Sequence, residues 1–190
     1  MNVIAVGFVT GVLGSLVASG LFLRFMLSLR PRIEISPQIG RMQGETRTYY
    51  IIKFINKTAV DLINVQMEFR RLIRHKVEGG YVNDTVGIAL KRSNIMVLYK
   101  FDHNDKEVQY AFRALTYEDL HAACGPDCKL DFRIYAAHSV SGFGKVFHWQ
   151  YKSSDIIDGD FLFGNTLEII PKPYQGSSPA TPPLPSHTPP

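Results

Sequence analysis

The chain has 190 residues, of which 45% are apolar and two are Cys, and its formal charge is +4. This length suits one folded domain with appendages, and it excludes both a disulfide-stapled miniprotein and a pair of ordinary enzyme domains. Two Cys residues also exclude a disulfide-rich secreted scaffold. The pI near 9.1 invites a nucleic-acid interpretation, so the charges must first be located along the chain.

The N-terminal segment, residues 3–23, has no charged side chain and is followed by Arg24 and by Arg30-Pro31-Arg32. About 20 apolar residues at 1.5 Å each cover the ~30 Å hydrocarbon core, which predicts a transmembrane helix. A cleaved signal peptide is the alternative, because small residues precede Gly20. The absence of an N-terminal basic residue, the length of the run and the Arg residues after it favour an anchor. We expect residues 3–29 to form the membrane helix and juxtamembrane segment.

The basic flank of this segment also predicts its orientation. Arg24, Arg30 and Arg32 follow the apolar run, whereas no Lys or Arg precedes it. The positive-inside rule therefore places the N-terminus outside the cell and residues 33–190 in the cytoplasm, with the chain crossing the inner (cell) membrane once.

Small residues recur every four positions within the predicted helix, at Gly7, Gly11, Ser15 and Ser19. Such a face lets two helix backbones approach closely, and van der Waals contact then drives association in lipid. We expect copies of the chain to associate through this small-residue stripe and form a homo-oligomer in the lipid bilayer. The alternative is that Gly and Ser are simply common in transmembrane helices.

Residues 30–170 have the two-residue periodicity of half-buried strands, interrupted by turn residues. This predicts an all-β, immunoglobulin-like antiparallel β-sandwich. One short helix is expected at residues 116–123, capped by Thr116 and followed by acidic residues. The expected strands are residues 50–56, 62–73, 87–90, 95–101, 108–115, 130–137, 145–151 and 161–170.

The C-terminal segment, residues 171–190, is rich in Pro, Ser and Thr and has no acidic residue. It cannot bury enough apolar surface to offset its ordering entropy, so a disordered tail is predicted. Two PxxP patterns in it fit SH3-like grooves. A protein partner bound through this tail or through the β-sandwich is therefore one hypothesis, and a plain disordered tail is the other.

Several segments are similar in order and type to the cytoplasmic domain of inward-rectifier potassium channels. Arg30-Pro31-Arg32-Ile33 resembles the basic exit from that family's inner helix, and residues 52–57 with 62–70 resemble its Asn-ended strand and the long strand after it. Residues 132–145 with Tyr151 resemble its penultimate hairpin, and residues 160–164 resemble its final segment. The resemblance implies an immunoglobulin-like fold close to the membrane. It does not imply potassium conduction, because there is no pore helix and no TVGYG-like filter.

Candidates for chemistry are few. His121, Cys124 and Cys128 lie close in sequence, but no fourth zinc ligand is evident, so two reduced thiols are expected ahead of a disulfide or a metal site. The Gly142–Lys145 segment lacks the spacing of a phosphate loop and predicts a hairpin turn. Asp155, Asp158 and Asp160 are interpreted as a polar turn because the EF-hand spacing is missing. We predict no catalytic residue, metal or cofactor, and hence no enzyme.

Basic residues suggest two anion sites. Arg30 and Arg32 lie where a juxtamembrane Arg contacts anionic lipid, although they also serve to set topology. Arg70, Arg71 and Arg74 form the densest basic cluster in the domain, suited either to a phosphate or lipid headgroup or simply to a solvated strand end. Nucleic acid is not an expected partner, because stacking aromatic side chains do not alternate with these residues.

The excess of basic residues lies outside the folded domain. Three Arg residues lie within residues 1–32 and one Lys in the tail, and the remaining basic residues equal the 17 acidic ones in number. We therefore expect a non-enzymatic, membrane-anchored interaction or sensor module that self-associates through its helix. The alternative is an oligomeric membrane effector, as in bacterial defence, that forms a pore or disrupts the bilayer under the control of its cytosolic domain.

Overall fold

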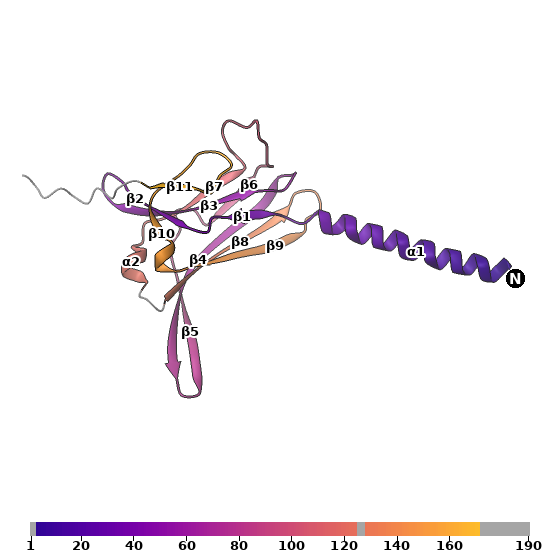
Figure 1. The fold of residues 1–190 in the computed structure, drawn as a ribbon, viewed down its shortest axis with the longest axis horizontal. Helices are drawn as coiled ribbons and strands as arrows, with labels where there is room; N and C mark the ends of the chain where they lie inside the picture. Colours follow the sequence, from indigo (N-terminus) through magenta and orange to yellow (C-terminus); the bar gives the residue numbers. More distant parts are fainter. Residues whose placement is uncertain (1–2, 125–127, 172–190) are drawn as a thin grey trace, which may run out of the picture.

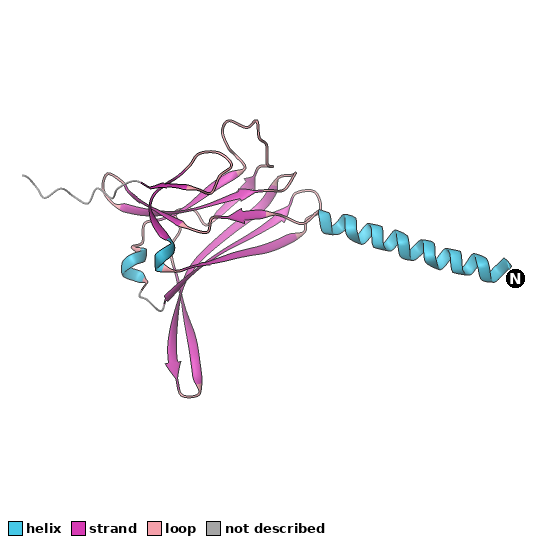
Figure 2. Ribbon diagram, viewed as in Figure 1, coloured by secondary structure: helices cyan, strands magenta, loops and turns pink. Residues whose placement is uncertain are grey.

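The computed structural model describes residues 3–124 and 128–171. A long apolar helix extends from a body made almost entirely of strands (Figures 1 and 2). The prediction of an all-β domain with one N-terminal helix is therefore confirmed. The tail predicted over residues 171–190 lies outside the described residues except for Pro171, which ends a strand.

Helix α1 spans Val3–Ser28 and contains neither Pro nor an acidic residue. Pro31 disfavours helical backbone at the residue before it, and the helix ends at Ser28, whose hydroxyl donates to the Phe25 carbonyl at 2.7 Å. By length and composition, α1 is the one helix in the described part of the chain that is long and apolar enough to cross a membrane.

The strands form two sheets, and among the described residues every strand pairing except one is antiparallel. In the first sheet, β3 pairs with β1 and β2 along one edge and with β7 along the other, and β2 leads on to β10 and β11. In the second, β4 pairs with β8 on one side and with β5 and β6 on the other, and β8 pairs with β9. The strands are β1 (Ile33–Ile35), β2 (Ile39–Gln43), β3 (Thr48–Asn56), β4 (Leu62–Val77), β5 (Gly80–Gly87), β6 (Asn94–Leu98), β7 (Ala111–Thr116), β8 (Cys128–His138), β9 (Gly144–Tyr151), β10 (Ile156–Phe161) and β11 (Ile169–Pro171).

The exception is the pairing of β10 with β2, which is parallel, with Ile156 opposite Ile39. The expectation of a purely antiparallel arrangement is wrong at this point. The chain enters β10 directly after the single turn of 3-10 helix at Ser153–Asp155, which carries it from the second sheet to the first. Such a crossover depends on contacts between distant segments and has no signal in the local periodicity.

Aromatic side chains join the two sheets in one core. Phe54 of β3 lies 5.5 Å from Phe112 of β7 and 6.3 Å from Phe132 of β8, measured between ring centroids. Phe132 in turn contacts Phe69 of β4 edge-on at 5.9 Å. The buried residues of both sheets belong to the same cluster, so removal of these rings from water stabilises the sheets as a unit.

The alternation predicted for β4 is confirmed over residues 65–69, where Val65 and Phe69 are buried and Gln66 is exposed. It is wrong before that point. Asn64 has a φ of 51° and the register shifts between Ile63 and Gln66, so a bulge turns Leu62 rather than Ile63 into the core.

Other boundaries also differ from expectation. Strands β1, β2, β5 and β10 were not among the expected ones, and residues 88–90 are not in a strand. The short helix α2 covers only Leu120–Ala123, and its N-cap is Asp119, which accepts hydrogen bonds from two backbone N–H groups of the helix. Thr116 instead ends β7, and its hydroxyl donates to the Ala89 carbonyl at 2.7 Å.

Candidate membrane-contact site

The small-residue stripe lies along one face of α1. Gly7, Gly11, Ser15 and Ser19 line a shallow groove of about 580 Å³ together with three larger apolar side chains. A Cβ atom added at Gly7 or Gly11 would meet nothing within 4 Å. The structure therefore brings the four predicted residues together on an exposed face, and no other described part of the chain covers it.

The β8–β9 turn, residues 139–143, lies at the end of the domain beside the C-terminal end of α1 (Figure 1). The Ser141 hydroxyl donates to the carbonyl of Leu29 at 3.2 Å. Residues of the helix end and of the turn line a common hollow of about 350 Å³. Its lining residues are Leu23, Met26, Leu27, Arg30, Phe143, Gly144 and Lys145.

Hydrogen bonds within the turn hold its shape. Nδ1 of buried His138 accepts from the backbone N–H groups of Val140 at 3.3 Å and Ser141 at 3.2 Å. The carbonyl of His138 accepts from the N–H of Gly142, whose φ of +71° suits glycine. The predicted hairpin turn is therefore confirmed, and its exposed side chains project from a well-ordered backbone.

Apolar and basic side chains share the outer surface of this turn. Val140 is 74% exposed and Phe143 is 41% exposed. Arg30 and Lys145, also exposed, have no carboxylate partner among the described residues, and the ammonium of Lys145 lies 4.7 Å from the Phe147 ring centroid. Apolar tips flanked by unpaired cations are typical of a surface that contacts the membrane–water boundary.

The second predicted lipid-contacting residue, Arg32, is exposed on the other side of buried Pro31. Its backbone N–H donates to Thr58 Oγ1 at 2.9 Å, and its carbonyl accepts from the N–H of Lys57 at 2.8 Å. These bonds attach the juxtamembrane backbone to the β3–β4 loop. The geometry thus places both arginines close to the end of α1.

The other predicted basic residues do not converge on one site. Arg70 lies 3.4 Å from the buried carboxylate of Asp131, which also accepts from Arg133 at 2.7 Å. Arg71 donates to the Ala123 carbonyl at 2.6 Å. Arg74 stacks its guanidinium 3.7 Å from the ring centroid of Tyr81. Arg70, Arg71 and Arg74 therefore have three separate sets of partners within the protein.

The expectation of two reduced thiols is wrong, because Cys124 and Cys128 form a disulfide. Their Cα atoms are 5.2 Å apart, a separation that suits such a bond. Cys128 begins β8 and Cys124 follows α2, so these two elements bring the sulfur atoms together. The described residues hold no group of three metal-ligating side chains, and His121 lies on the surface beside Tyr50.

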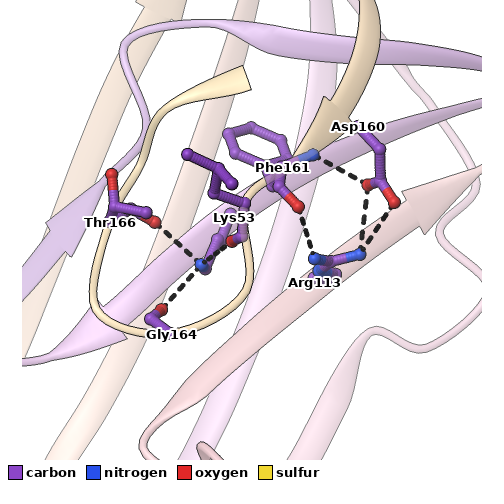
Figure 3. A network of polar contacts seen from close by, with 7 residues as sticks. Lys53, Arg113, Asp160, Phe161, Gly164 and Thr166 are labelled. Carbon is purple, nitrogen blue, oxygen red and sulfur yellow. Dashed lines mark hydrogen bonds and ion pairs between the residues drawn. The ribbon is translucent and has the colours of Figure 1, made fainter. Parts of the chain in front are cut away.

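A buried polar network, which the sequence reasoning missed, lies in the first sheet (Figure 3). Lys53 of β3 is 2% exposed, and its ammonium donates to the carbonyls of Leu162, Gly164 and Thr166 at 2.7 to 2.8 Å. Burial lowers the pKa of Lys53 to about 8, and the Arg113 charge adds to this effect. The one available signal was a Lys in the middle of an apolar strand.

Next to Lys53, Arg113 contacts the carboxylate of Asp160 at 3.1 Å and donates to the carbonyl of Phe161 at 2.8 Å. Asp158 pairs with Arg41, and this guanidinium holds the pKa of the carboxyl below its usual range. The interpretation of these aspartates as a polar turn is therefore wrong for Asp158 and Asp160, which belong to β10. The ion pair of Asp158 with Arg41 connects β10 to β2, and the ion pair of Asp160 with Arg113 connects β10 to β7.

A further hollow, of about 790 Å³, is an open groove along β6. Its polar lining consists mainly of the amide side chains of Asn64, Gln66, Asn94 and Gln109. None of these can serve as a nucleophile activated by a neighbouring base.

No family model matches this chain, and no curated protein does. The resemblance to inward-rectifier cytoplasmic domains accordingly rests on the residues that suggested it. The proposed function of this protein is therefore argued from the geometry of α1 and of the β8–β9 turn.

Proposed function

We propose that this protein is a single-pass, membrane-anchored interaction or sensor module whose copies associate through α1. The observation that carries the proposal is the small-residue stripe, which forms one continuous groove on a helix whose described side chains are exposed except for the partly buried Met26. Close backbone approach at Gly7 and Gly11 gives two such helices extensive van der Waals contact in lipid.

The domain is proposed to be an immunoglobulin-like sandwich of the inward-rectifier type. Strand β3 ends at Asn56, whose buried amide donates to the carbonyls of Val60 at 3.1 Å and Tyr99 at 2.8 Å. Its Oδ1 accepts from the N–H of Thr58, so one side chain organises the turn into the long strand β4. This local geometry supports the resemblance in fold, which implies no ion conduction.

We place the domain in the cytoplasm and the N-terminus outside the inner membrane. Arg24, Arg30 and Arg32 at the end of α1 support this orientation. The disulfide between Cys124 and Cys128 is the observation that opposes it, because such bonds persist in oxidising compartments. The orientation is therefore the first property of the whole molecule to test.

The domain offers one surface suited to a protein partner. Beyond Ile73, the last residue of β4 paired with β8, β4 and β5 continue alone as an arm, residues 74–83, directed away from the body (Figure 1). Every residue of β5 is exposed, including the apolar Tyr81 and Val82. An isolated two-stranded hairpin is only marginally stable, which supports a role in contacting a partner.

The test of self-association replaces Gly11 with Ile in the full chain. The branched side chain separates the two backbones, so the oligomer is expected to dissociate to the monomer mass in sedimentation of the detergent-solubilised protein. Gly20→Ile is the matched control, because Gly20 lies about 180° around the helix from Gly11 and also has nothing within 4 Å. An oligomer that survives Gly11→Ile as well as Gly20→Ile contradicts the proposal.

The same variants address the alternative of a membrane effector. Vesicles loaded with a fluorescent dye should stay intact when the wild-type chain is inserted. If the wild-type chain causes leakage, and Gly11→Ile abolishes it while the protein stays membrane-bound, then the protein acts as a membrane effector and the proposed interaction or sensor function is wrong.

A further inference from the structure

The depth of α1 in a bilayer follows from its sequence and pitch. Residues 3–23 carry no charge and extend over about 31 Å at 1.5 Å per residue, which matches the ~30 Å hydrocarbon core. Arg24 therefore lies at the boundary of the core. The helix continues to Ser28 through exposed apolar side chains, including Phe25 and Leu27, so its last turn lies in the headgroup layer.

The β8–β9 turn lies at this same depth. Phe143 and Lys145 line one hollow with Leu23 and Leu27, about 6 Å apart along the helix axis. The headgroup layer is about 5–8 Å thick on each side of the hydrocarbon core. Because the Ser141 hydroxyl is hydrogen-bonded to the Leu29 carbonyl, the turn keeps this position relative to α1.

The chemistry of the turn suits that depth. Phe143 offers an aromatic ring that is 41% exposed, and Lys145 carries a flexible ammonium that can reach phosphates while its stem stays in the apolar layer. Asp61, Asp102 and Asp105 share a different hollow with Val140, which none of the α1 residues lines. These carboxylates mark the limit of the surface that lipid can cover.

We infer that the β8–β9 turn is a second membrane contact, with the Phe143 side chain inserted at the boundary between headgroups and acyl chains. The inference rests on the proposed anchoring of α1 and adds a lipid-facing surface within the β-sandwich domain. The chain then has two attachment points on the bilayer, α1 and the β8–β9 turn. Together they limit the tilt of the domain relative to the membrane. The occupant of the hollow beside Phe143 is therefore the bilayer itself.

The experiment places a tryptophan at the turn and measures quenching by brominated phospholipids. Trp149 is the only tryptophan in the chain, so Trp149→Phe provides a silent background. Phe143→Trp in this background reports the turn, and Leu16→Trp reports the middle of α1. Tyr81→Trp on the arm is the matched control, since it replaces one exposed aromatic side chain with another away from α1.

In vesicles of brominated lipid, we expect tryptophan at positions 143 and 16 to lose at least half of its fluorescence and tryptophan at position 81 to lose none. Bromine near the headgroup end of the chain should quench position 143 more than position 16, and bromine deep in the chain should do the opposite. That reversal is the signature of insertion at the boundary.

Three results overturn the inference. Quenching at position 16 without quenching at position 143 leaves the anchor intact and shows that the turn stands off the membrane. Equal quenching at positions 143 and 81 shows that the domain lies on the bilayer without a specific contact at the turn. Absence of quenching at position 16 removes the proposed anchor and the inference with it.

Discussion

Lys53 illustrates how one residue can hold a segment of chain in place. A buried ammonium loses its hydration, and this cost is offset only if other groups accept its hydrogen bonds. Three carbonyls from residues 162–166 do so, each within 2.8 Å. The Lys53 side chain therefore attaches the connection between β10 and β11 to the central strand of the first sheet.

Replacing Lys53 with Met should lower the free energy of unfolding by about 2–4 kcal/mol, because the three carbonyls lose their donor in a buried site. Urea denaturation of the full chain in detergent measures the change. Lys57→Met is the control, since the Lys57 ammonium is partly exposed and its polar contacts with Glu34 and with Asn165 of the same connection are each expected to contribute below about 1 kcal/mol. A Lys53→Met variant as stable as the wild type would show that apolar packing replaces the network.

At the scale of elements, β10 is the part of the fold that depends most on close backbone contact. Gly159 has a φ of +155°, and a Cβ atom there would lie 2.1 Å from the Ile170 carbonyl oxygen in β11. The same residue packs against Gly40, whose own Cβ would lie 2.9 Å from the Gly159 carbonyl oxygen. The approach of β10 to β2 thus requires glycine at position 40, and its approach to β11 requires glycine at position 159.

Gly159→Ala should therefore destabilise the domain by about 2–4 kcal/mol, through steric contact with β11 and an unfavourable φ. Gly87→Ala is the matched control, because a Cβ atom at Gly87 meets nothing within 4 Å and its φ is not positive. Thermal unfolding followed by circular dichroism distinguishes them. Equal melting temperatures for the two variants would contradict the proposed backbone contact.

The arm, in contrast to β10, is stabilised by exposed contacts between its side chains. It is stabilised by the stacking of Arg74 on Tyr81 and by the contact of His75 with Asp84 at 3.2 Å, all of it exposed. No residue of the arm belongs to the core cluster. Substitutions in the arm are therefore expected to leave the fold of the domain intact.

For the whole molecule, the decisive measurement is its orientation. With the domain in the cytoplasm, fusion of alkaline phosphatase after Pro190 should be inactive and fusion of a green fluorescent protein should be bright. Changing Arg24, Arg30 and Arg32 to Gln should reduce this difference, because these residues set the orientation. A strongly active phosphatase fusion would reverse the orientation and would account for the disulfide between Cys124 and Cys128.

Much of the fold and of the candidate site is visible in the sequence. The membrane helix follows from the uncharged run at residues 3–23, the β class from two-residue alternation, and the β8–β9 turn from its glycines. The groove on α1 follows from the four-residue spacing that begins at Gly7 and Gly11, which helical geometry converts into one face. Each of these properties is encoded by neighbours in the chain.

Only the tertiary structure decided which distant groups become partners. Lys53 binds carbonyls 109 to 113 residues away, and Arg41 pairs with Asp158, 117 residues away. The disulfide, the separation of the predicted Arg cluster into three contacts, and the position of the turn beside Leu29 were settled in the same way. The hydropathy and spacing of a segment indicate which of its side chains are buried. Which distant residue each buried side chain contacts depends on how the whole chain packs.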